Sequence, residues 1–190
     1  MVAPTSLISV VVVLNRDGDL VARFMERATH TWPVDAGSIR RSLSVAPDER
    51  FIDSVACMLV AAGYWGLAQL DFIEHRSERL LLDINPRYYL GLPLALACGV
   101  NLAGAWHAVV SGQPTMPLRR YRSGVSYRWL AADVVTALRG SPGALLYRRT
   151  GRRAGAMWLR DDPLPGWLLA ATVLVSHVVR YLRRVRQRKR

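Results

Sequence analysis

The feature that most limits the fold of this chain is a pair of predicted β-hairpins on either side of one helix. Strand-type runs cover residues 8–14 and 20–29, and the Asp17-Gly18 turn joins them. Apolar residues then recur at helical spacing over residues 48–62, and two further strand-type runs cover residues 65–74 and 79–84. We therefore predict an α+β fold, in which an antiparallel sheet is flanked by helices.

The rest of the chain divides into three predicted parts. The first part, residues 1–135, also contains a loop over residues 30–37, two short helices over residues 92–98 and 102–110, and the start of a helix over residues 129–138. Residues 136–162 form an Arg- and Gly-rich connector, and residues 163–190 form an apolar helix with a basic tail. We predict one lobe followed by a basic helical C-terminal extension.

The net positive charge of the chain comes from its last third. Residues 119–190 carry sixteen arginines and Lys189, the only lysine, against three acids, whereas residues 1–118 have a net charge of −2. Cys57 and Cys98 lie in apolar stretches without metal-ligand spacing, which excludes a disulfide scaffold or a structural zinc site and favours a reducing compartment. Both cysteines are expected to be buried in helices.

One group of polar residues has the chemistry of a ligand site. Asp83 and Asn85 are two apart on a predicted strand and share a face, and antiparallel pairing can bring Asp71 beside them. An all-oxygen set of this kind suits Mg²⁺ that bridges substrate phosphates, and Arg87 could bind phosphate oxygens in pairs. From the spacing alone, an ordinary strand end and turn is an equal alternative, because Asp, Asn and Pro are common turn residues.

Three segments together resemble the C-terminal lobe of the ATP-grasp ligases: residues 63–73 (GYWGLAQLDFI), 81–87 (LLDINPR) and 97–102 (ACGVNL). They are similar to a family pattern of an acid before Phe on one strand, acid-x-Asn-Pro-Arg on the next, and a small-residue helix ending in Gly-Val-Asn-Leu. Outside this core, the elements that resemble the carboxylate–amine ligase branch are Arg27, Trp32-Pro33, Gly37-Ser38, residues 121–125 and residues 128–133.

The resemblance implies binding of ATP and Mg²⁺. It makes Asp71 and Asp83 metal-bridging carboxylates, Asn85 a metal ligand that also binds the cofactor, and Arg87 the catalytic residue on the transferred phosphate. The implied activity is that of a carboxylate–amine (or thiol) ligase acting on a small-molecule carboxylate through an acyl-phosphate, with protein groups supplying position and charge neutralisation. Asp83 departs from the family, which usually has the longer Glu at this place.

The other half of an ATP-grasp enzyme, an N-terminal lobe with phosphate-binding lysines, is not recognisable in this sequence. We therefore expect that activity needs a separate N-terminal lobe or a homo-oligomer, or that the chain is a truncated form. The expected location is the cytoplasm.

The alternative is a non-catalytic remnant that binds a partner or an anionic membrane surface through its C-terminal helix. The apolar run over residues 167–179 precedes six arginines and Lys189, a pattern typical of an interfacial helix, although it also suits a helix packed on its own domain or one that spans a membrane. The basic region lacks a nucleic-acid motif, so nucleic acid is an unfavoured partner. Arg40 and Arg41 are expected either to reach substrate or to lie exposed on a strand.

Overall fold

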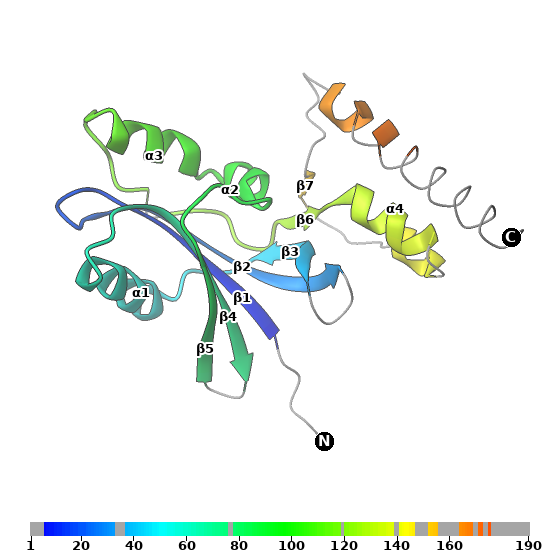
Figure 1. The fold of residues 1–190 in the computed structure, drawn as a ribbon, viewed down its shortest axis with the longest axis horizontal. Helices are drawn as coiled ribbons and strands as arrows, with labels where there is room; N and C mark the ends of the chain where they lie inside the picture. Colours follow the sequence, from blue (N-terminus) through cyan, green and yellow to red (C-terminus); the bar gives the residue numbers. More distant parts are fainter. Residues whose placement is uncertain are drawn as a thin grey trace, which may run out of the picture.

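The computed structural model describes residues 6–32, 37–75, 78–118, 120–138, 141–146, 152–155, 164–168, 171–172 and 175. Seven strands form one sheet in the order β5-β4-β1-β2-β3-β6-β7 (Figure 1). Their bounds are Ser6–Leu14 (β1), Leu20–Trp32 (β2), Ser38–Ser44 (β3), Gly66–His75 (β4), Glu78–Asn85 (β5), Ser126–Arg128 (β6) and Arg153–Gly155 (β7). The predicted α+β fold is confirmed, and every neighbouring pair of strands is antiparallel except β6–β7, which is parallel.

The first hairpin forms where the sequence predicts it. In its turn, the Asn15 side-chain oxygen accepts hydrogen bonds from the backbone N–H groups of Asp17 and Asp19, at 3.0 and 2.7 Å. Strand β2 is longer than predicted, however, because residues 30–32 pair with β3 instead of starting a loop. His30 and Thr31 are polar and show no apolar alternation, which is why pairing to β3 was not visible in the sequence.

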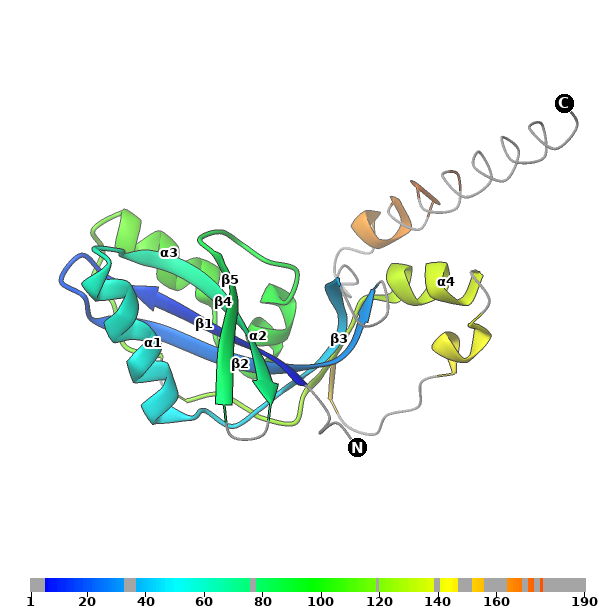
Figure 2. The same cartoon turned by 60° about the horizontal axis from the view of Figure 1, so that its bottom comes forward.

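Helix α1 (Glu49–Ala61) covers one face of the sheet (Figure 2). The carboxylate of Asp48 caps its first turn by accepting a hydrogen bond from the Phe51 backbone N–H at 3.2 Å. Its buried stripe of Ile52, Val55, Ala56 and Leu59 packs against the β1 and β4 side chains of that face. Cys57 is exposed and not buried as predicted, because one residue beyond Ala56 turns about 100° away from this stripe.

Helices α2 (Leu92–Cys98) and α3 (Leu102–Val110) cover the opposite face (Figures 1 and 2). Gly99 ends α2 in a left-handed conformation with φ of 101°, and Asn101 then caps α3 through the Gly104 N–H at 2.8 Å. Buried side chains of both helices, including Cys98 as predicted, join Val11, Phe24 and Tyr127 of the sheet in the second core cluster.

The described part of the C-terminal third adds helix α4 (Leu130–Leu138), the short helix η1 (Pro142–Leu145) and strand β7. Most of the predicted apolar helix and its basic tail, including residues 176–190, lies outside the described residues. Among the described ranges, no single helix is long and apolar enough to cross a membrane. Taken together, helices α2 and α3 are long and apolar enough for a membrane span, but the chain bends by 100° at the break between them.

Candidate functional site

A row of polar side chains crosses the sheet on the face that α2 and α3 cover. The register places Asp83 (β5) opposite Asp71 (β4), Asp71 opposite Ser9 (β1), and Ser9 opposite Glu26 (β2). Because opposite residues share a face, the four side chains lie in sequence across four adjacent strands. The second predicted hairpin therefore brings Asp71 and Asp83 together as expected.

Hydrogen bonds hold the acidic end of the row in place. Asp71 Oδ1 accepts from the Ser9 hydroxyl at 2.5 Å and from Gln69 Nε2 at 3.2 Å. Asp83 Oδ2 accepts from Asn85 Nδ2 at 3.0 Å, a bond that does not use the Asn85 amide oxygen. The Asp71 carboxylate is thus held by a hydrogen bond from β1, while Asp83 and Asn85 are hydrogen-bonded to each other on the exposed edge strand.

A cavity of about 360 Å³ lies over this row and runs from β5 towards β6. Its walls include all four predicted site residues, Asp71, Asp83, Asn85 and Arg87. Gly37 and Ser38, two of the outlying elements of the resemblance, also line it. The sequence-predicted site residues therefore converge on one cavity, although Asp83 and Arg87 are exposed to solvent at its outer end.

The charges at the outer end influence one another. Burial raises the pKa of the Asp71 carboxyl; the Ser9 hydrogen bond opposes this shift, the nearby Asp83 charge adds to it, and the Arg87 guanidinium opposes it. Two facing carboxylates beside one arginine form a site that a cation would stabilise, since the repulsion between Asp71 and Asp83 is only partly balanced.

The inner end of the cavity is lined by residues that were not predicted from the sequence as site residues. Glu26, Tyr89 and Tyr127 line it, and both Glu26 and Tyr127 are 1% exposed. Burial raises the pKa of Glu26 to about 7; the Ser42 hydroxyl, which donates to Glu26 Oε2, works against the shift, and the Asp71 charge adds to it. Alternation along β2 could have found Glu26, because it shares a face with buried Ala22 and Phe24.

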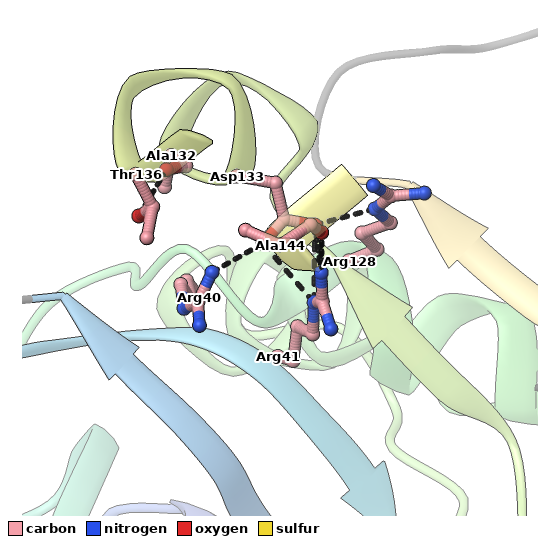
Figure 3. Close-up of polar contacts among 7 residues, drawn as sticks. All are labelled: Arg40, Arg41, Arg128, Ala132, Asp133, Thr136 and Ala144. Carbon is pink, nitrogen blue, oxygen red and sulfur yellow. Dashed lines mark hydrogen bonds and ion pairs between the residues drawn. The ribbon is translucent and has the colours of Figure 1, made fainter. Parts of the chain in front are cut away.

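Arg40 and Arg41 are not exposed, so one of the two alternatives predicted for them is wrong. Both are buried, and both bind the fully buried carboxylate of Asp133 on α4, at 2.7 Å from Arg40 Nη1 and 2.7 Å from Arg41 Nη2 (Figure 3). Arg128 joins them through Nε at 2.5 Å. Their burial was not predicted because the partner, Asp133, lies more than ninety residues further along the chain.

Arg27, another outlying element of the resemblance, is placed away from the cavity walls. Its Nη1 donates to Glu74 Oε2 and to the Ser6 hydroxyl, each at 2.5 Å. In this structure Arg27 therefore joins β2 to β1 and β4.

The donor set fits Mg²⁺ only in part. Within the described residues, no group of three or more His, Cys, Asp and Glu side chains could hold a metal ion by itself. Asp71, Asp83 and Asn85 offer two carboxylates and an amide, all oxygen donors, and Mg²⁺ commonly combines one or two carboxylates with substrate phosphates and water. The residues thus suit a cation that arrives with a phosphate ligand.

Solved structures that resemble this chain in fold include biotin carboxylases. The biotin carboxylase domain of a thermophilic 2-oxoglutarate carboxylase bound to bicarbonate matches 66% of this chain and 30% of its own, with a TM-score of 0.53 and 12% identity. The Hydrogenobacter thermophilus 2-oxoglutarate carboxylase domain, in complex with MgADP and bicarbonate, matches 64% and 28%, with a TM-score of 0.53 and 12% identity. A Campylobacter jejuni biotin carboxylase complex with β,γ-ATP matches 66% and 29%, with a TM-score of 0.52 and 15% identity.

These matches define the class of fold. Biotin carboxylases belong to the ATP-grasp superfamily, so the described lobe has the fold of part of an ATP-grasp protein, as the sequence resemblance implied. The chain spans less than a third of the length of each of these structures. Comparison of the sequence with protein families finds no match, and no curated protein matches it.

Proposed function

We propose that this chain supplies the metal- and phosphate-binding half of an ATP-grasp ligase site. Asp71, Asp83 and Asn85 would hold Mg²⁺, and Arg87 would bind the transferred phosphate. The observation that carries the proposal is the meeting of these four residues on one cavity of an ATP-grasp fold. The biotin carboxylases of the same fold, with MgADP or an ATP analogue bound, support the choice of ligand class.

The proposed activity is ATP-dependent joining of a small-molecule carboxylate to an amine or a thiol through an acyl-phosphate. Bound Mg²⁺ would neutralise phosphate charge. Ser9 and Gln69 hold the Asp71 carboxylate in one orientation, and Asn85 does the same for Asp83. Arg87, exposed at the mouth of the cavity, can turn its guanidinium towards a phosphate or an acyl-phosphate, where its planar fork forms two parallel hydrogen bonds.

The lobe supplies one wall of such a site. A second wall, from a separate N-terminal lobe or another copy of the chain, is part of the proposal, as is a cytoplasmic location. The alternative, in which residues 163–190 bind a membrane surface or a partner protein, stays a prediction, because most of that segment lies outside the described residues.

Calorimetric titration of the full chain with ATP in the presence and absence of Mg²⁺ tests the proposal. Binding should require Mg²⁺ and should weaken at least about tenfold in Asp83→Ala, which removes one carboxylate. Asp53→Ala is the matched control, since Asp53 is an exposed acid on α1 outside the cavity. Equal binding by the wild-type chain and Asp83→Ala would exclude these residues as the metal site.

A further inference from the structure

The inner end of the cavity contains polar groups without a partner among the described residues. The hydroxyls of Tyr89 and Tyr127 are both buried, and neither has a hydrogen-bond partner in the part of the chain that the structure describes. Most buried polar groups in proteins are paired, so two orphaned hydroxyls on one cavity indicate that a ligand completes them. Tyr127 is 1% exposed, so its hydroxyl is available only from within the cavity.

Glu26 lies beside Tyr89 and close to the strand position of Tyr127. A Cβ built at Gly91, the residue before α2, would lie 2.4 Å from Glu26 Oε1 and 2.4 Å from Tyr89 Cε2, so the carboxyl and the ring are close to each other on one side of Gly91. The Ser42 hydroxyl, which donates to Glu26, belongs to the residue that pairs with Tyr127 in the sheet. Burial is the main cause that raises the pKa of both phenols, and the Glu26 charge raises it further. One acid and two hydroxyls therefore form a compact group, which we call the inner polar subsite.

The charges select the kind of ligand. Glu26 and the neighbouring Asp71 disfavour an anion, and within the cavity wall the cationic Arg87 lies at the exposed outer end. A thiol brings one weak donor, whereas a primary ammonium brings a positive charge and three N–H donors for one carboxylate oxygen and two phenol oxygens. Charge-assisted bonds of this kind are the strong ones.

We infer that the inner polar subsite binds the ammonium group of an amine substrate, with Glu26 as its counter-charge and the Tyr89 and Tyr127 hydroxyls as acceptors. The inference rests on the proposed function and narrows it: the acceptor is an amine and not a thiol. Ser9 lies between Glu26 and Asp71 in the polar row, so the bound amine is next to the end of the cavity assigned to phosphate.

The test uses methylammonium chloride as the probe and NMR of ¹³C-labelled tyrosine rings in the full chain. Tetramethylammonium chloride at the same ionic strength is the ligand control, because it has the charge without N–H donors. We expect saturable shifts with methylammonium in the wild-type chain, about tenfold weaker affinity in Tyr89→Phe and in Tyr127→Phe, and no saturation in Glu26→Gln.

Tyr88→Phe is the matched variant control, since Tyr88 is 50% exposed and lies outside the cavity wall. Its affinity should equal that of the wild-type chain. Equal shifts from tetramethylammonium, or unchanged affinity in both cavity Phe variants, would overturn the inference.

The titration contains neither ATP nor Mg²⁺, so its outcome is separate from that of the proposed function. Saturation by methylammonium without any Mg²⁺-dependent ATP binding would support the ammonium subsite and overturn the ligase proposal. Mg²⁺-dependent ATP binding that is lost in Asp83→Ala, without methylammonium saturation, would overturn the inference alone.

Discussion

Asp71 on β4 lies directly opposite Asp83 on β5, so the sheet holds two carboxylates face to face at the mouth of its cavity. Like charges in opposite positions of an antiparallel pair destabilise the sheet. A chain that used these residues only for folding would gain from replacing either one. Their juxtaposition supports the proposal that a cation binds between them.

The first prediction is that Asp83→Asn stabilises the chain in the absence of Mg²⁺ and weakens its Mg²⁺-dependent binding of ATP. Removing one of the facing charges should raise the free energy of unfolding by about 0.5 kcal/mol. Urea denaturation without Mg²⁺ measures the first effect, and calorimetry measures the second. A variant that is both less stable and normal in binding contradicts the assignment.

The second prediction concerns the pH dependence of stability. The Glu26 carboxyl has a pKa of about 7 in the folded chain, raised from 4.5, so it holds its proton more tightly when folded. Stability should therefore fall as the pH rises from 4.5 to about 7, by about 3 kcal/mol from this group alone. Glu26→Gln should lose this part of the decline, which urea denaturation at several pH values would show. An unchanged slope in Glu26→Gln would mean that other groups produce it.

The third prediction is that Asp133→Asn destabilises the chain by about 3–5 kcal/mol, because it leaves buried arginines without their counter-charge. Arg128→Ala should cost about 1 kcal/mol or less, since the Arg128 side chain is 28% exposed and two arginines remain on Asp133. Denaturation of both variants gives the comparison. Similar small losses in the two variants would argue against a tightly buried cluster.

The fourth prediction concerns the close contact at Gly91. In Gly91→Ala the new methyl group would meet Glu26 Oε1 at 2.4 Å, so we expect a loss of about 1–3 kcal/mol. Gly143→Ala is the control, because a Cβ there meets no described residue within 4 Å and Gly143 is not among the glycines with positive φ. Thermal unfolding of the two variants should separate them clearly.

Local signals in the sequence were enough for most of the elements and for the outer end of the site. Gly99 and Asn101 marked the break between α2 and α3, and the alternation of Asp83 and Asn85 placed both on one face. Residues brought together by long-range pairing were not predictable in this way. Asp133 meets Arg40 and Arg41 only because α4 packs beside β3 and β6, and Tyr127 joins Glu26 only through the order of the sheet.

The buried Asp133 cluster also determines how much of this chain can be produced as a working fragment. A fragment that ended with α3, after Val110, would keep Arg40 and Arg41 in β3 but would lack both Asp133 and the Ala144 carbonyl that accepts from Arg41. In that fragment the two buried guanidinium groups would lose the carboxylate and the carbonyl that they bind in the full chain. Expression trials should therefore retain the chain at least through η1, even though the four site residues predicted from the sequence all lie before residue 90.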